Sequence, residues 1–131
     1  MKGLRLLLLL SLLTLSFVHF QQPVLAQKSV PVEDFTFKQK TGNGAYLFVR
    51  WTDGFRVEIS VWLGHNERRG SITPLWNSNQ RPKMVVLRDS DLPFRLMERL
   101  VAAADQDQRH DIMQEEQNRL RVFAQRATVQ D

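Results

Sequence analysis

Residues 45–63, AYLFVRWTDGFRVEISVWL, carry the pattern that decides the fold. In residues 45–51 and again in residues 55–63, apolar side chains recur at every second position, which is typical of strands with one buried face. The intervening residues 52–54, TDG, have the composition of a tight turn. The stretch therefore predicts a β-hairpin.

The alternation also predicts the register of this hairpin, because a slip of one residue would turn a whole strand over. A two-residue loop would place Val49 opposite Glu58 and mix polar with apolar groups on both faces. A three-residue loop with Gly54 in the left-handed conformation gives one apolar face. Its cross-strand pairs are Trp51 with Phe55, Val49 with Val57, and Leu47 with Ile59.

A further strand precedes this hairpin. Residues 35–40 alternate, and residues 41–44, TGNG, are turn formers. With residues 42–44 as a three-residue loop, Phe37 lies opposite Val49 and Phe35 opposite Trp51, so three strands share one apolar face.

The segment that follows, residues 64–83, is polar and contains two glycines and two prolines. We expect an irregular excursion here, with a short strand at residues 71–73. Residues 83–88, KMVVLR, are apolar enough to predict a fourth strand, whose partner the sequence does not determine.

The period changes to helical after Asp91, with Leu92, Leu96 and Leu100 at four-residue spacing. Pro93 is tolerated in a first turn, so a helix should begin between Asp91 and Pro93. One helix to the end would extend about 50 Å, too long for so small a domain. We therefore expect a break near residues 105–107, where Asp105 and Gln108 have capping-box spacing. The second helix would carry Ile112, Met113, Leu120, Phe123 and Ala127 on one side.

Together these patterns predict an α+β fold: a small antiparallel sheet of three or four strands, a meander of hairpins, packed on one face by one or two C-terminal helices. The expected core joins helix residues to the apolar face of the sheet. Leu96, Leu100, Val101, Ile112 and Leu120 should meet Leu47, Val49, Val57 and Ile59.

The first 26 residues differ from the rest and have the features of a signal peptide. The apolar run at residues 6–18 is shorter than the roughly 17 residues needed to span a bilayer, and cleavage is expected after Ala26. An uncleaved anchor is the alternative. We therefore expect an exported protein, periplasmic or secreted, without a stable membrane anchor after cleavage. Residues 27–34 would be a flexible lead-in, and residues 35–131 a single domain.

Charge and cysteine content exclude several classes of function. Without the two basic residues of the first segment, 16 basic and 14 acidic residues remain, so the net charge is only +2. Strong attraction to nucleic acid is therefore not expected. The absence of cysteine excludes a disulfide scaffold, a thiol nucleophile and Cys-ligated zinc. We expect no cofactor.

The first candidate site is the outward face of the predicted sheet, on which basic and aromatic side chains alternate. Guanidinium groups pair with anionic groups and flat rings stack on planar ones, so the face could bind an anionic polymer. Alternatively, the segment 71–80 or a second copy of the chain covers this face. The face comprises Lys38, Lys40, Tyr46, Phe48, Arg50, Arg56, Glu58 and Trp62.

The second candidate is the loop at residues 64–70, which contains His65, Glu67, Arg68 and Arg69 between two glycines. Arg68 and Arg69 could contact an anion. His65 with Glu67 would be the centre of a hydrolase, but no recognised catalytic motif accompanies them, and a solvated hairpin tip explains the loop better.

A third cluster, on the C-terminal helix, places Asp107, His110, Asp111 and Glu115 at helical spacing. It lacks a specific ligand motif, so we interpret it as a solvated face and predict no metal site. The sequence thus favours an exported, non-catalytic interaction or ligand-binding domain. Its partner would be an anionic glycan, a lipid or an envelope protein, with a homodimer as a further option and the small hydrolase as the alternative function.

Overall fold

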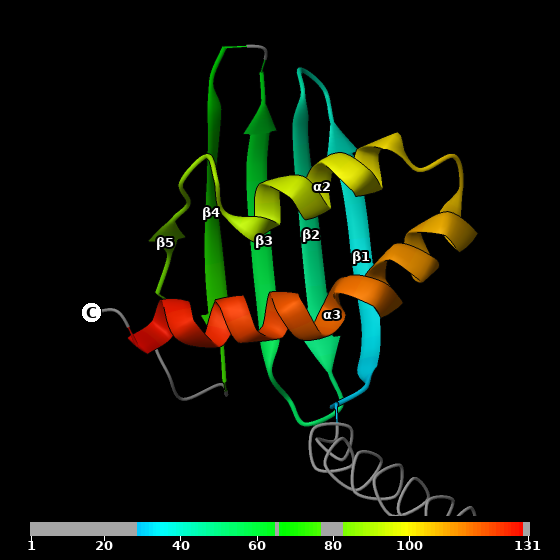
Figure 1. Ribbon diagram of the computed structural model, residues 1–131, viewed down its shortest axis with the longest axis vertical. Coiled ribbons are helices and arrows are strands. Elements are labelled where there is room, and N and C mark those ends of the chain that lie inside the picture. Colours follow the sequence, from blue (N-terminus) through cyan, green and yellow to red (C-terminus); the bar gives the residue numbers. More distant parts are fainter. Residues whose placement is uncertain (1–28, 65, 77–82, 130–131) are drawn as a thin grey trace, which may run out of the picture.

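The computed structural model describes residues 29–64, 66–76 and 83–129. Its strands form one antiparallel sheet in the order β1-β2-β3-β4-β5. Both helices cross the same face of this sheet (Figure 1). The predicted α+β meander is confirmed, with five strands where three or four were expected. The elements are β1 Val32–Lys40, β2 Gly44–Trp51, β3 Arg56–Leu63, β4 Arg68–Leu75, β5 Val85–Val86, α2 Leu92–Ala102 and α3 Gln106–Val129.

The hairpin of β2 and β3 has the predicted register. Val49 lies opposite Val57 and Leu47 opposite Ile59. Gly54 adopts the left-handed conformation, with φ of 93°. The turn is closed by a 3.0 Å hydrogen bond from the Gly54 amide to the carbonyl of Trp51.

The register predicted for the first hairpin is wrong by two residues. Phe35 lies opposite Val49, and Phe37 lies opposite Leu47. The loop closes one residue earlier than expected, at residues 41–43, because both Gly42 and Asn43 take positive φ values, 76° and 69°. A shift of two residues keeps every side chain on its face, so the apolar face is preserved.

Strand β1 also begins earlier than predicted. It starts at Val32, within the expected flexible lead-in. The amide of Thr52 donates a 3.0 Å hydrogen bond to the carbonyl of Pro31, which ties this segment to the turn between β2 and β3. Strand pairing therefore orders residues whose composition alone indicates a linker.

The largest correction concerns the segment 64–83. Instead of three strand residues in an irregular excursion, β4 has eight, Arg68–Leu75, all paired with β3. Its proline, Pro74, lacks an amide donor, but in the described residues β5 pairs only with Ser71 and Ile72. Pro74 thus lies where β4 needs a partner on one side only, a position that tolerates proline. The predicted strand at residues 83–88 is reduced to the two residues of β5.

The helices follow the sequence pattern closely. Helix α2 begins at Leu92 and ends at Ala102, and α3 begins at Gln106, so the predicted break is confirmed. Asp105 Oδ1 accepts a 2.9 Å hydrogen bond from the Gln108 amide, and Gln108 Oε1 accepts one of 2.8 Å from the Ala104 amide. This reciprocal pair satisfies backbone donors that a helix start leaves open.

The core lies between the sheet and the helices. Leu96, Leu100 and Leu120 are buried as predicted, together with the apolar residues of β2 and β3. Val101 and Ile112 are only partly buried, and Met113 takes the central position expected of Ile112. The largest fully buried side chains are Trp51, Phe55, Phe94, Leu47, Ile59, Ile72, Leu96, Met97, Leu100, Leu120, Val49 and Val57.

Arg121 connects α3 to the turn between β2 and β3. Its guanidinium donates two hydrogen bonds to the carboxylate of Asp53, one of them 3.1 Å long. The same group lies 5.0–5.6 Å from the ring centroids of Phe55, Trp51 and Trp76. Cation–π contacts and a charge-assisted bidentate pair thus hold the helix against the hairpin.

Candidate functional site: the open face of the sheet

The face of the sheet that lies opposite the helices carries the first predicted site. The strand registers place Lys38, Tyr46 and Ser60 in one row across the strands. A neighbouring row contains Phe48 and Glu58. All eight predicted residues lie on this face, and Trp62 and Lys40 share a row because both lie opposite Gly44.

Three aromatic side chains form a stripe along this face. Phe48 and Tyr46 are two residues apart on β2, which is about 7 Å along a strand. Trp62 continues the stripe beside Gly44, which has no side chain to cover the ring. Trp62 also lies against Gly42 and Gly64, where an added Cβ would be 3.3 Å and 2.7 Å from the indole. The glycines therefore seat an indole that is 38% exposed.

Basic side chains flank the aromatic stripe. The Lys40 ammonium lies 5.7 Å from the centre of the Tyr46 ring, and the Arg50 guanidinium 5.9 Å from that of Phe48. Arg50 also pairs with Asp34 at 3.3 Å, where both groups are exposed. In the described part of the chain, Arg56 and Lys38 make no ion pair or hydrogen bond through their side chains. Each can thus meet an external anion without first losing a partner.

One acidic group on this face is already engaged. The hydroxyl of Tyr46 donates a 2.7 Å hydrogen bond to Glu58 Oε1. Burial, and then the hydrogen bond and charge of Glu58, raise the pKa of Tyr46 to about 12. Tyr46 is therefore neutral at physiological pH, and its hydroxyl fixes Glu58 beside the middle of the stripe.

The structure separates the predicted pair Arg68 and Arg69. Because they are successive strand residues, their side chains point to opposite faces. Arg68 forms a 2.7 Å ion pair with Glu98 on α2, on the helix side. Arg69 lies opposite Trp62 on the open face and pairs with Glu67 at 3.4 Å. Only Arg69 lies on the same face as the basic set, whereas Arg68 is paired with Glu98 on the helix side.

The segment expected to cover the face does not do so over the range that is described. Residues 71–75 belong to β4 and lie within the sheet. Trp76 packs on Phe55 at 4.5 Å between ring centroids, and Phe55 belongs to the core on the helix side. The remainder of the predicted cover, residues 77–80, lies outside the described residues. In the alternative hydrolase site, His65 also lies outside the described residues, and Glu67 forms an ion pair with Arg69.

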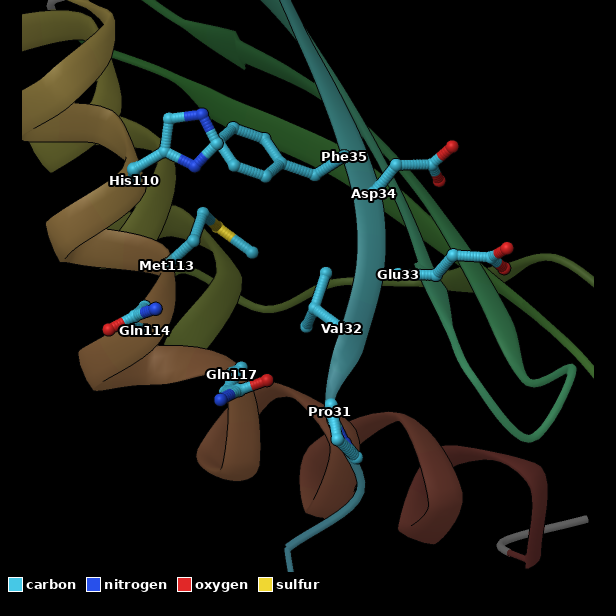
Figure 2. A pocket seen from close by; sticks show the side chains of 9 residues that line it. All are labelled: Pro31, Val32, Glu33, Asp34, Phe35, His110, Met113, Gln114 and Gln117. Atoms are coloured by element: carbon cyan, nitrogen blue, oxygen red, sulfur yellow. The ribbon is translucent and has the colours of Figure 1, made fainter.

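A hollow lies between β1 and the first half of α3 (Figure 2). Its volume is about 180 Å³. Val32 and Phe35 point toward the helix, whereas Glu33 and Asp34 point away from it. His110 stacks on the Phe35 ring edge to face, at 4.9 Å, so it is part of this wall. Within the described residues, no group of three or more His, Asp or Glu side chains could hold a metal ion.

No protein-family model, curated protein or solved structure matches this chain. In the described ranges, no helix is long and apolar enough to span a membrane. The interpretation of the site therefore depends on its own geometry.

Sequence reasoning missed the part of the open face that β4 and β5 contribute. Ser71 and Thr73 lie beside Ser60 and Glu58, and Val86 lies next to Ser71. The alternation of Ser71, Ile72 and Thr73 was the available signal, but the neighbouring glycine and proline obscured the length of the strand. The face is consequently wider than the three predicted strands.

Proposed function

We propose that this protein is a non-catalytic binding domain that recognises an anionic, ring-containing ligand, an anionic glycan above all, through the open face of its sheet. The observation that carries the proposal is the aromatic stripe of Phe48, Tyr46 and Trp62, flanked by basic side chains of which Lys38 and Arg56 have no partner in the described residues.

The chemistry of the face suits a ligand with flat apolar surfaces and negative charges. A sugar ring presents such a surface through its C–H groups, and it can stack on Tyr46 or Trp62. Carboxylate or sulfate groups on the same chain can then pair with Arg56 and Lys38. Because the face is open rather than a deep cleft, an extended polymer fits it better than a small molecule.

The expected export of the chain supports the same class of ligand. The signal-peptide features of residues 1–26 direct the protein to the periplasm or the exterior, where anionic glycans and envelope proteins are abundant and nucleic acid is not. We propose this location together with the function.

The test is a titration of residues 27–131 with oligosaccharides that carry carboxylate or sulfate groups, beside a neutral oligosaccharide of equal length. Calorimetry reports binding, and so does tryptophan fluorescence in the variant Trp76→Phe, where Trp62 is the exposed emitter beside the buried Trp51. We expect the anionic ligands alone to bind, more weakly as salt rises. The variant Arg50→Glu with Arg56→Glu should lower the affinity about tenfold or more, since two attractive contacts become repulsive.

The matched control reverses two exposed arginines on the helices, Arg95→Glu with Arg126→Glu, and so changes the net charge equally. Its affinity should stay within about twofold of wild type. Equal losses in the two variants would show a nonspecific effect of net charge. A large fall in melting temperature for the Arg50 and Arg56 variant would show that the face is structural.

A further inference from the structure

Strand β1 leaves one edge of the sheet without a neighbour in the described chain (Figure 1). Its nine residues, Val32–Lys40, extend about 30 Å and present a row of unpaired backbone donors and acceptors. Such an edge binds another strand unless the protein discourages it.

The side chains of β1 disfavour pairing of its edge with most other strands. Lys38 and Lys40 are exposed, and the pairing of β1 with β2 shifts between Val32 and Asp34. Charges and irregularities of this kind prevent indiscriminate edge pairing. A strand that adds to β1 must therefore bring acidic groups to the lysines and apolar groups to the side that faces the helices.

The sequence of β1 itself meets these requirements. When two copies pair antiparallel with Thr36 opposite Thr36, Asp34 of each faces Lys38 of the other. On the helix side, Phe35 faces Phe37 twice. A shift of two residues in one direction sets Phe37 opposite Glu33, and in the other direction sets Phe35 opposite Gln39. The second shift also sets Asp34 opposite Lys40, but it leaves one pair of rings, Phe37 with Phe37, where the Thr36 register has two. The Thr36 register therefore joins the most opposite charges and aromatic rings at once.

We propose that two copies of this chain associate through β1, in this register, about a twofold axis. The interface is isologous, because each copy contributes the same strand. It joins the two sheets into one of ten strands and places both open faces on the same side. The inference rests on the edge and its charges and does not require the proposed ligand, but it would double the surface offered to an extended polymer.

The hollow beside β1 fits such a partner. In this register, Phe37 of the second copy lies next to Phe35, whose ring lines the hollow with Met113. Gln117 contributes a buried Oε1 that accepts no hydrogen bond within the described residues.

The charges in the isolated chain agree with the proposal. Lys38 makes no ion pair in the described residues, and Asp34 pairs only with Arg50, at 3.3 Å on the exposed surface. Exposed pairs of this kind are weak and easily shared. The acidic group is thus free to turn toward a lysine of the second copy at little cost.

The experiment measures the solution mass of residues 27–131 by light scattering and sedimentation, without ligand, over about 1 to 500 µM protein. The wild type should form a dimer. Lys38→Asp sets like charges opposite each other twice, and so does Asp34→Lys, so each variant should raise the dimer dissociation constant about tenfold or more. Mixing the two variants restores both opposite-charge pairs and should yield a heterodimer. Arg95→Asp, on α2, is the charge-matched control and should dimerise as the wild type does.

A wild type that stays monomeric throughout this range overturns the proposal, whether or not ligand titrations succeed. A dimer that survives both single variants, or fails to form when they are mixed, places the interface elsewhere and overturns it too. If the wild type is monomeric but β1 amide resonances shift with an unrelated extended peptide, the edge serves a foreign strand instead of a second copy. Ligand binding by a monomer would leave the proposed function intact.

Discussion

Leu47 and Phe48 are neighbours on β2, yet they face opposite sides of the sheet. Leu47 is fully buried among the residues of the core, whereas Phe48 is half-buried on a face that no described element covers. Large apolar side chains on the helix side are explained by the stability that their burial in the core gives the fold. Those on the open side are not, and this difference is the basis of our proposal that the open face serves binding.

The largest expected effect separates these two neighbours. Leu47→Ala removes buried volume and should lower the free energy of unfolding by about 2–5 kcal/mol. Phe48→Ala removes a half-buried ring and should cost about 1–2 kcal/mol. Urea unfolding measures both, and ligand titration should show loss of affinity for Phe48→Ala alone among variants that remain folded. Equal losses of stability would contradict the comparison.

Two glycines sharpen the comparison. At Gly70, on the helix side, an added Cβ would lie 2.9 Å from the backbone oxygen of Ser60 and 3.3 Å from the ring of Phe94. Gly70→Ala should cost about 1–3 kcal/mol, because the strand and α2 would have to move apart. At Gly64 the nearest atom is Nε1 of the exposed Trp62, which can turn aside.

Gly64→Ala should therefore change stability little, by about 0.5 kcal/mol or less, but shift the fluorescence of Trp62. Thermal unfolding and emission spectra of the two variants test this pair. A destabilised Gly64→Ala with an unmoved indole would show that Trp62 is held as rigidly as the core.

Substitution of Arg121 should lower the free energy of unfolding less than substitution of Gly70 does, and its effect should depend on pH. Arg121→Ala removes three cation–π contacts and the partner of Asp53, and should cost about 1–2 kcal/mol; Arg126→Ala, at an exposed site on the same helix, is the control.

The hydrogen bond from Arg121 holds the pKa of Asp53 below its ordinary 3.8. This contribution is thus present above about pH 3.8 and is lost as the pH falls through the lowered pKa. Wild type and Asp53→Asn should therefore converge in stability toward low pH. A constant difference down to pH 2 would contradict the link.

Tyr46 gives the smallest and most local effect. It is the single tyrosine in the sequence, so its ionisation can be followed by ultraviolet absorbance. The midpoint should lie near 12 in the folded protein, and Glu58→Gln should move it only part of the way toward 10.0, because burial is the larger cause. The raised pKa favours the folded state below pH 10, and this contribution is lost as the pH rises through 12. A midpoint of 10 in protein that circular dichroism shows to be folded would contradict both the burial of Tyr46 and its contact with Glu58.

The sequence predicts the local structure correctly where only one conformation suits the residues present. The three-residue turn at Gly54 and the cap formed by Asp105 and Gln108 are such cases. The first hairpin was misjudged by two residues because such a shift preserves the alternation that the prediction used. The sequence does not predict most of strand β4, because it does not reveal that Gly70 suits the contact with Phe94 or that Pro74 suits a position paired with β3 on one side only.

The sequence predicts the candidate site as far as it shows which alternate residues of a strand share one face, here called strand parity. Parity placed Lys38, Tyr46, Arg50 and Arg56 on one face correctly. It would also have separated Arg68 from Arg69 had the strand been recognised there. The hollow between β1 and α3 joins segments about 75 residues apart in the chain, so only tertiary packing brings it into existence.

The central claim is that the face bearing Trp62 is open in solution, and acrylamide quenching tests it most directly. In the variant Trp76→Phe, only Trp51, fully buried, and Trp62 remain, and the further variant Trp62→Phe leaves Trp51 as a protected reference. The account predicts that Trp62 is quenched readily, in the monomer and equally in a dimer formed through β1. A Trp62 as protected as Trp51 would show that the face is covered and would contradict the account.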